Sequence, residues 1–303
     1  MSIKSWVPWW AKIAGKVALS RLPFAYQLWQ NVGLFRHGAM DSAAYSTSVF
    51  HTHVQRAGLT ATLNGKTILE LGPGDSIATA LISKAHGARA ILIDRADFAR
   101  LDLTCYLDLA QLLEKLGLAP PQLTDARSLN DVLDACEARY LTDGLNSLKE
   151  LPSRSVDLVF SHAVLEHVRR AEFLETQIEC RRVMRTDAIA SHRIDLRDHL
   201  GGRLNNLRFS EALWESQFFS FSGFYTNRIQ FSEMLDLFSK AGFSVELGEV
   251  ERWDVLPTSR DKLAEPFRKK RADELCVSGF DVMLRVKVNG EDGNQRKPGT
   301  DHV

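Results

Sequence analysis

The fold of this 303-residue chain is decided by residues 67–76, which read T-I-L-E-L-G-P-G-D-S. A short apolar run there leads into a turn that has no side chain at Gly72 or Gly74, and a helix is expected to begin directly after it. Glycine lets a ligand lie against the backbone, and the start of a helix offers N–H groups without intrahelical partners. Asp94 ends a second apolar run 22 residues after Gly72, where a carboxylate accepts hydrogen bonds from a ribose diol. The pattern predicts a strand–turn–helix unit that binds a nucleoside.

Two residues indicate which nucleoside fits this turn. A dinucleotide-binding turn has the pattern G-x-G-x-x-G, but its third glycine position holds Ile77, whose β-branched side chain opposes close packing around a pyrophosphate. Glu70, at the end of the strand, would repel a diphosphate and suits a ligand that carries an amino group and a sulfonium. An NAD(P)-dependent oxidoreductase is therefore the alternative class, and a sulfonium-bearing nucleoside is the favoured ligand.

Two motifs carry a resemblance to a known family. The segment E-L-G-P-G-D-S at residues 70–76 resembles motif I of the class I S-adenosylmethionine (SAM) methyltransferases, with Ser76 in place of the third glycine of the family pattern. Residues 155–168, S-V-D-L-V-F-S-H-A-V-L-E-H-V, resemble the strand-four motif of the same superfamily and look most like the subgroup often labelled type 11. Together the motifs cover about the middle third of the chain, and they imply SAM as the cofactor.

The cofactor-binding residues are expected at the carboxyl ends of the first four strands, where open α/β sheets bind their ligands. They are Glu70, Gly72, Gly74, Asp94, Asp143 and Ser161. The resemblance implies that Glu70 and the glycines hold the methionine part, Asp94 the ribose and Asp143 the adenine. It places Ser161 at the methionine backbone or on the acceptor side. A plain Asp-Gly turn is the alternative for Asp143.

Short apolar runs alternate with helical patterns along the chain, which predicts a parallel sheet. Strands are expected at residues 67–71, 90–94, 139–142, 156–161 and 189–196, followed by two antiparallel strands at 244–250 and 280–288. Helices are expected at residues 9–30, 41–57, 76–85, 107–116, 131–138, 172–184, 231–240 and 260–275. The fold class is α/β: a Rossmann-like, seven-stranded, mostly parallel sheet with an antiparallel last strand and helices on both faces.

The chain is expected to divide into three parts. Residues 1–58 form an N-terminal helical arm, residues 59–288 form the methyltransferase-like domain, and residues 289–303 form a polar, disordered tail. The domain carries insertions at about 95–138 and 200–230. The first 40 residues contain five basic residues, no acidic residue and four of the six tryptophans, which suits a helix on an anionic membrane surface. We favour an arm packed over the domain, with peripheral membrane contact through residues 1–30 as the alternative.

Bulk composition excludes several classes. Lys plus Arg equals Asp plus Glu at 38 each, so no overall positive field points to a nucleic acid partner. Four cysteines lie far apart without a CxxC pair, which favours reduced thiols over disulfides or a zinc site. No apolar run reaches the roughly 18 residues of a membrane span. A cytoplasmic protein is expected, with the inner face of a membrane as its site if the N-terminal arm is interfacial.

Methyl transfer from a sulfonium mainly requires that acceptor, methyl group and sulfur be aligned. An oxygen acceptor also needs a base within hydrogen-bond reach, and histidine is the usual choice near neutral pH. His199, beside Asp198 in the loop after the fifth strand, is the first candidate, and His162 at the end of the fourth strand is the second. His167 belongs to the tetrapeptide L-E-H-V, which looks like a family element that anchors the following helix, so it is expected to be structural.

The acceptor is expected to contact residues that follow the fifth strand. These candidates are Asp195, Asp198, Trp214, Tyr225, Asn227 and Arg228. Asparagine with aromatic residues suits a polyhydroxylated acceptor, and Arg228 suits a phosphate or carboxylate. The alternative is that the aromatic residues pack a subdomain over the sheet. The pattern loosely resembles bacterial methyltransferases found with surface-polysaccharide biosynthesis enzymes.

The fifth strand and the loop after it offer a second chemical interpretation, because two histidines and two carboxylates there could ligate a metal ion. That set is His192, Asp195, Asp198 and His199. No metal is assigned, since such spacings are common by chance. The sequence favours SAM-dependent O-methylation of a glycan precursor or other small polar acceptor, with an NAD(P)-dependent oxidoreductase and a non-catalytic SAM-binding scaffold as alternatives.

Overall fold

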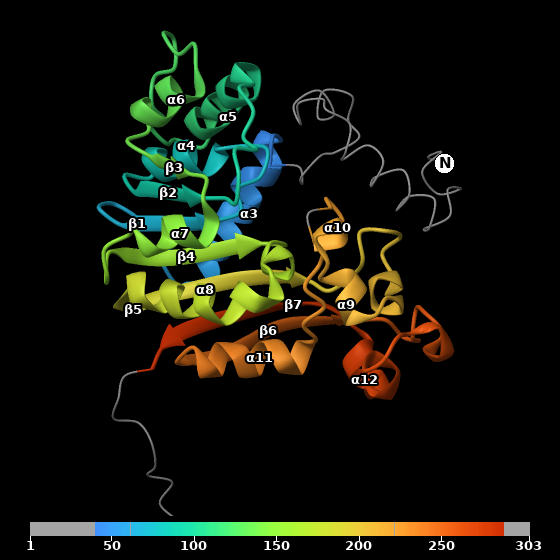
Figure 1. Ribbon diagram of the computed structural model, residues 1–303. Coiled ribbons are helices and arrows are strands. Elements are labelled where there is room, and N and C mark those ends of the chain that lie inside the picture. The colour runs from blue at the N-terminus through green and yellow to red at the C-terminus, as the bar shows by residue number, and fades with distance from the viewer. Residues whose placement is uncertain (1–39, 61, 221, 288–303) are drawn as a thin grey trace, which may run out of the picture.

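The computed structural model describes residues 40–60, 62–220 and 222–287. A single seven-stranded sheet organises this part of the chain, in the order β3-β2-β1-β4-β5-β7-β6 (Figure 1). Its strands are β1 (Thr67–Leu71), β2 (Arg89–Ile93), β3 (Arg139–Leu141), β4 (Val156–His162), β5 (Met184–Asp195), β6 (Phe243–Arg252) and β7 (Val277–Val286). The first five strands pair in parallel, and β7 runs antiparallel to both β5 and β6. The predicted fold class is confirmed.

Helices cover both faces of the sheet (Figure 1). They are α3 (Ala43–Arg56), α4 (Ala78–Ala85), α5 (Leu103–Lys115), α6 (Leu129–Ala135), α7 (Gly144–Lys149), α8 (Arg170–Val183), α9 (Glu211–Trp214), α10 (Gln217–Ser220), α11 (Phe231–Lys240) and α12 (Ala272–Leu275). Short 3₁₀ turns are η2 (Leu165–His167), η3 (Asn205–Arg208), η4 (Arg260–Lys262) and η5 (Phe267–Lys269). Helices α9, α10 and α12 gather at the end of the sheet toward which β4 points, which is the carboxyl end of the parallel strands.

Alternate residues of the central strands supply two hydrophobic cores, because successive side chains of a strand point to opposite faces. On one face Ile68 and Phe160 pack with α3, α4, α5 and α6. On the other face Leu69 and Val159 pack with α7, α8 and α11. All four of these side chains are fully buried. Strands buried on both faces read as continuous apolar runs, which is why the sequence pattern located them.

Helix α3 is the described part of the predicted N-terminal arm, and it belongs to the first core. Ser42 caps it by accepting a hydrogen bond from the backbone N–H of Tyr45. Phe50 is fully buried against the sheet, and Arg56 forms an ion pair with Asp281 of β7. Residues 1–39, which carry the predicted membrane contact, lie outside the described residues, as does the tail 288–303.

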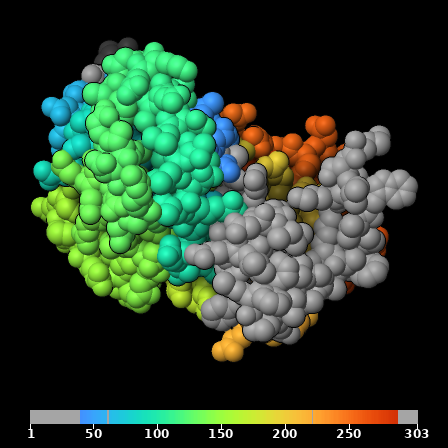
Figure 2. All heavy atoms as spheres, turned by 90° about the horizontal axis from the view of Figure 1, so that it is seen from above, coloured from blue at the N-terminus to red at the C-terminus, as the bar shows by residue number. Residues whose placement is uncertain are grey.

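The predicted insertion at about 95–138 contains α5 and α6. Tyr106, Leu113 and Val132 from these helices are buried in the core beneath α4. Figure 2 shows the green segments around these helices on a different side of the view from the orange and red segments that follow β5. The insertion therefore extends the hydrophobic core as well as lying beside the strand ends.

One expected helix is wrong. Residues 260–275 form η4, η5 and only the short α12. Pro266 lies in the middle of this stretch, where it lacks a backbone N–H and disfavours a helical conformation at the preceding residue.

No helix in the described part of the chain is long and apolar enough to cross a membrane. All four cysteines are free thiols in the structure.

Candidate active site

The turn after β1 has the conformation that its glycines were expected to supply. Gly72 and Gly74 adopt φ angles of 72° and 66°, in the left-handed region that favours glycine. The N–H of Gly72 donates to the Ile93 carbonyl at 2.8 Å, and the N–H of Gly74 donates to Oδ2 of Asp94 at 3.1 Å. These bonds join the ends of β1 and β2 into one rigid edge.

The missing side chain at Gly72 has a different use from the one expected. A Cβ atom on Gly72 would lie 2.5 Å from both Cγ atoms of Val164, in the loop after β4. The prediction that a ligand fills this space is therefore wrong for Gly72, because Val164 already fills it. The close approach of Val164 fixes the loop after β4 against the turn after β1.

Glu70 is a buried carboxylate directly beneath this turn. Its exposed fraction is 3%, and its Oε2 has no hydrogen-bond partner among the described residues. Burial raises the pKa of Glu70 to about 8; the Thr79 hydroxyl lowers it and the nearby Asp94 charge raises it further. At neutral pH the group is therefore mostly protonated, and a cation that reaches it, such as an ammonium group, favours its ionised form.

Asp94 and Asp143 lie at the ends of the next two strands. Asp94 is partly exposed, and its Oδ1 accepts a hydrogen bond from the N–H of Arg95 at 2.7 Å. Its backbone carbonyl accepts one from the N–H of Gly144 at 2.8 Å, which brings the end of β3 beside the end of β2. Asp143 is exposed and accepts a hydrogen bond from the Asn146 side chain at 3.2 Å. The structure thus brings five of the six expected cofactor residues to one edge of the sheet.

Two residues that the sequence pattern did not indicate support this edge. Tyr106 of α5 accepts a hydrogen bond from the N–H of Ile77 at 3.2 Å and donates one to the Arg100 carbonyl at 3.0 Å. The Arg100 guanidinium lies 3.7 Å from Oδ2 of Asp75, which follows the glycine turn. Both come from the segment interpreted as an insertion, and no local pattern linked them to the turn.

Two cavities lie beside Tyr106, and Ser76 and Cys105 also line both of them. The first has no room for a water molecule, and the second encloses about 10 Å³. Small-molecule sites usually measure roughly 300–1,000 Å³. Neither cavity as described would hold a whole nucleoside.

Ser161 is the sixth expected cofactor residue, and its position contradicts that prediction. It is fully buried within β4, where its Oγ lies 2.8 Å from Nδ1 of His192 on β5. His192 is also fully buried, stacks on Phe238 of α11 and has its pKa lowered to about 3 by burial. Ser161 is therefore a core contact below the edge of the sheet.

His162, the second candidate base, faces the opposite side of the sheet from Ser161. Its Nε2 lies 3.3 Å from the Tyr45 hydroxyl, and its Nδ1 lies 3.4 Å from Nε2 of His53. Burial and then the Arg193 charge lower the pKa of His162. His53 is fully buried and also contacts the Ser191 hydroxyl at 2.8 Å. Both ring nitrogens of His162 thus have partners within the protein.

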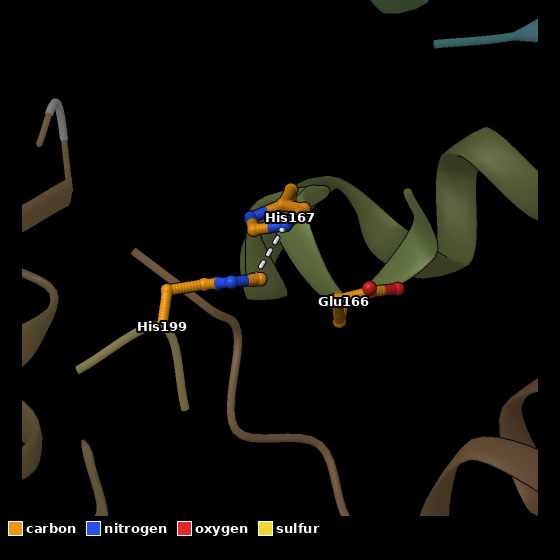
Figure 3. A group of neighbouring side chains, drawn as sticks. All are labelled: Glu166, His167 and His199. Atoms are coloured by element: carbon orange, nitrogen blue, oxygen red, sulfur yellow. Dashed lines mark hydrogen bonds between the residues drawn. The ribbon is translucent and has the colours of Figure 1, made fainter. Parts of the chain in front are cut away.

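His199, the first candidate base, lies at the carboxyl edge and is exposed. Its Nε2 is 3.0 Å from Nε2 of His167, and the two rings stack with centroids 4.7 Å apart. Glu166 is buried beside them (Figure 3). Burial raises the pKa of Glu166 well above its usual range. His167 therefore has a partner at the site that the sequence interpretation did not expect.

Most of the expected acceptor residues are structural. Trp214 is fully buried, and its Nε1–H donates to the Thr226 carbonyl at 2.7 Å. Asn227 donates from Nδ2 to the carbonyls of Leu165 and Val168, and it is 1% exposed.

Two more acceptor candidates have partners inside the same subdomain. The Arg228 guanidinium lies over the Trp214 and Phe267 rings and donates to the Phe209 carbonyl at 2.7 Å. Tyr225 is buried and donates to Glu215 at 2.9 Å. The prediction that these four side chains face an acceptor is wrong, because packing over the sheet occupies them.

The four residues considered as metal ligands also do not meet. His192 points into the core, while Asp195 pairs with the guanidinium of Arg197 at 2.8 Å. Asp198 is buried and accepts hydrogen bonds from the backbone N–H groups of Leu200, Gly201 and Asn205. Asp198 therefore shapes its own loop, whereas Asp195 remains partly exposed at the edge.

No protein-family model and no curated protein sequence matches the chain. Among solved structures, it is similar to a SAM-dependent methyltransferase of Methanosarcina mazei, with 15% identity and a TM-score of 0.45 over 78% of this chain and 96% of that one. It is similar to an arsenic(III) SAM methyltransferase of Chlamydomonas reinhardtii, with 16% identity and a TM-score of 0.42 over 75% of this chain and 65% of that one. It is also similar to phosphoethanolamine N-methyltransferase 2 of Haemonchus contortus, solved with SAM, with 15% identity and a TM-score of 0.43 over 78% of this chain and 51% of that one. At these values we take neither a residue role nor a substrate from the likenesses.

Proposed function

We propose that this protein is a SAM-dependent methyltransferase that acts on an oxygen of a small polar acceptor. The observation that supports the cofactor most strongly is the buried Glu70 carboxylate, with Oε2 unpartnered among the described residues, beside the Gly72–Gly74 turn. A buried carboxylate is stable as an anion only when it is paired. The ammonium group of a methionine moiety is a suitable partner, and a pyrophosphate is not.

The residues at the edge of the sheet fit the rest of SAM. Asp94 is partly exposed at the end of β2 and would accept hydrogen bonds from the ribose hydroxyls. Asp143, exposed at the end of β3, would lie toward the adenine. Bound SAM supplies a methyl group already activated by the sulfonium, so the protein's part is to align the acceptor and to remove its proton.

His199 is the base that we propose, with His162 second. His199 is exposed at the carboxyl edge, whereas His162 is half-buried with both ring nitrogens engaged. A glycan precursor is the acceptor class that we propose. Its support is the sequence resemblance after β5 together with Asp195 at the edge, because the other five expected acceptor residues are buried.

The oxidoreductase alternative has less support. Ile77 is fully buried at the start of α4, where a dinucleotide-binding turn has a glycine. Thermal unfolding with SAM, S-adenosylhomocysteine, NAD or NADP separates the two classes, because a ligand selective for the folded state raises the melting temperature. A rise with NAD and none with millimolar SAM would overturn the proposal.

Asp94→Ala tests the site directly. Loss of two hydrogen bonds from a carboxylate to the ribose should weaken SAM binding about 100-fold, measured by calorimetry. Asp97→Ala is the matched control, since Asp97 is exposed three residues further along the same loop and should bind SAM normally. Asp94→Asn keeps the shape of the side chain, and it serves as a second variant in case Asp94→Ala fails to fold. Unchanged SAM affinity in both Asp94 variants contradicts the assignment.

A further inference from the structure

Glu166, His167 and His199 form a cluster at the carboxyl ends of β4 and β5. Glu166 and His167 belong to η2, directly after β4, and His199 lies in the loop after β5. One ligand atom from each residue lies within 4.8 Å of the others (Figure 3). Among the described residues this is the one group of three or more His, Cys, Asp or Glu side chains that meets this distance.

The hydrogen bonding of His167 fixes its tautomer. Its Nδ1 lies 2.7 Å from the Tyr225 carbonyl oxygen, which can only accept, so Nδ1 carries the hydrogen. In the neutral ring Nε2 then carries the lone pair, and this atom is hydrogen-bonded to Nε2 of His199. A carbonyl on the far nitrogen is the usual arrangement of a metal-ligating histidine.

The distances suit a single ion. Two ligands about 2.1 Å from an ion and at right angles to each other are about 3.0 Å apart, and the two Nε2 atoms are 3.0 Å apart. Ligands on opposite sides of an ion are about 4.2 Å apart. The cluster spans up to 4.8 Å, so a carboxylate shift of roughly half an ångström completes the set.

Glu166 supplies an independent indication of a ligand. It is 1% exposed, and neither of its carboxylate oxygens has a hydrogen-bond partner among the described residues. Buried carboxylates are normally paired or bound to a metal ion. Asn227 holds the turn that presents Glu166, because its N–H donates to the Glu166 carbonyl at 2.7 Å and its Nδ2 to the Leu165 carbonyl at 2.8 Å. These two hydrogen bonds fix the backbone of the turn that presents the carboxylate.

We propose that Glu166, His167 and His199 bind a divalent first-row transition metal ion. Two imidazoles and one carboxylate suit Zn²⁺, Fe²⁺, Mn²⁺ or Co²⁺, whereas Mg²⁺ prefers oxygen ligands alone. Three protein ligands leave coordination positions for water or an acceptor oxygen. That use as an acceptor-holding site rests on the proposed function, and with an ion bound the role of base passes from His199 to His162, because a ligating imidazole nitrogen cannot accept a proton. Binding of the ion itself does not rest on the proposed function.

Metal titration of the full-length protein tests the site. After treatment with a chelator and its removal, Co²⁺ should bind at one ion per chain with visible absorption bands, and Zn²⁺ should displace it. His199→Ala should weaken Co²⁺ binding at least about 100-fold. Loss of a residue that only hydrogen-bonds to a metal ligand already weakens metal binding by up to about 100-fold, and His199 is proposed as a direct ligand. His199 is exposed, so this variant is expected to melt like the wild type in metal-free buffer.

His51→Ala is the matched control. His51 and His86 form a second pair with Nε2 atoms 3.1 Å apart, but no third ligand joins them among the described residues. Glu166→Gln keeps the side-chain shape and should lose Co²⁺ binding while SAM binding is kept, which separates failure of the metal site from failure of the cofactor site. Absence of stoichiometric Co²⁺ binding, binding unchanged in His199→Ala, or binding lost in His51→Ala overturns the proposal.

Discussion

Glu70 and Glu166 are two buried carboxylates at the same edge of the sheet, and their surroundings differ. Glu70 is the second-last residue of β1, beneath a glycine turn, with Asp94 nearby. Glu166 follows β4 beside two imidazoles. Each has an oxygen without a hydrogen-bond partner in the described part of the chain. The partner that we propose for Glu70 is an organic cation, whereas the imidazoles around Glu166 suit a metal ion.

The pH dependence of stability gives the largest expected effect for Glu70. Its pKa is raised to about 8 in the folded protein from 4.5, so the folded state binds the extra proton. The stability it contributes is full below about pH 4.5 and is lost as the pH rises through about 8. At about 1.4 kcal/mol for each pKa unit, the loss is about 4 to 5 kcal/mol.

Urea unfolding of the wild type and Glu70→Gln between pH 5 and 9 measures this effect. The variant should keep its free energy of unfolding where the wild type loses it, because glutamine does not ionise. Glu166 and the histidines are common to both proteins, so the difference between the two curves isolates Glu70. Parallel curves would show that Glu70 is charged and already paired, and the contrast with Glu166 would then fail.

Gly72→Ala tests the contact that joins the two regions. Gly72 lies two residues after Glu70, and Val164 lies two residues before Glu166. The new methyl group would meet Val164 at 2.5 Å in a backbone with a φ of 72°. Conformational strain of about 1 to 2 kcal/mol and overpacking of about 1 to 3 kcal/mol should lower the free energy of unfolding by about 2 to 5 kcal/mol.

Gly117→Ala is the control for this variant. Gly117 has a φ of 78° with no atom within 4 Å of an added Cβ, so it carries the strain without the contact. Adding Val164→Ala to Gly72→Ala should relieve the overpacking part, which chemical unfolding of the double variant would show as non-additivity. If the two glycine variants lost the same free energy of unfolding, the loop after β4 would move to accommodate the new methyl group without a measurable penalty.

The sheet was predictable because its signals are local. The pattern placed β1 at residues 67–71 and α11 at 231–240, the bounds that the structure has. Residues 144–149 were not expected to be helical, since Gly144 after an aspartate is also typical of a turn. In 260–275 helical composition was outweighed by Pro266.

The candidate site was only partly predictable. Glu70 and Asp94 lie beside glycines or strand ends that identify them in the sequence. Glu166 and His199 are 33 residues apart and meet only because β4 and β5 are neighbours in the sheet. Trp214 and Asn227 have the composition of a binding surface, but composition does not indicate which side chains pack inward.

Ser161→Ala gives the smallest expected effect and sharpens the comparison from a third position. Ser161 is a buried polar group whose partner, His192, is present, unlike the partners of Glu70 and Glu166. Removing the hydroxyl leaves Nδ1 of His192 buried without a partner, which should cost about 1 to 3 kcal/mol of unfolding free energy. SAM affinity measured by calorimetry should stay unchanged, because Ser161 lies in the core. A variant that keeps its stability and loses SAM binding would restore Ser161 to the cofactor site and show that the edge of the sheet reaches deeper than Glu70.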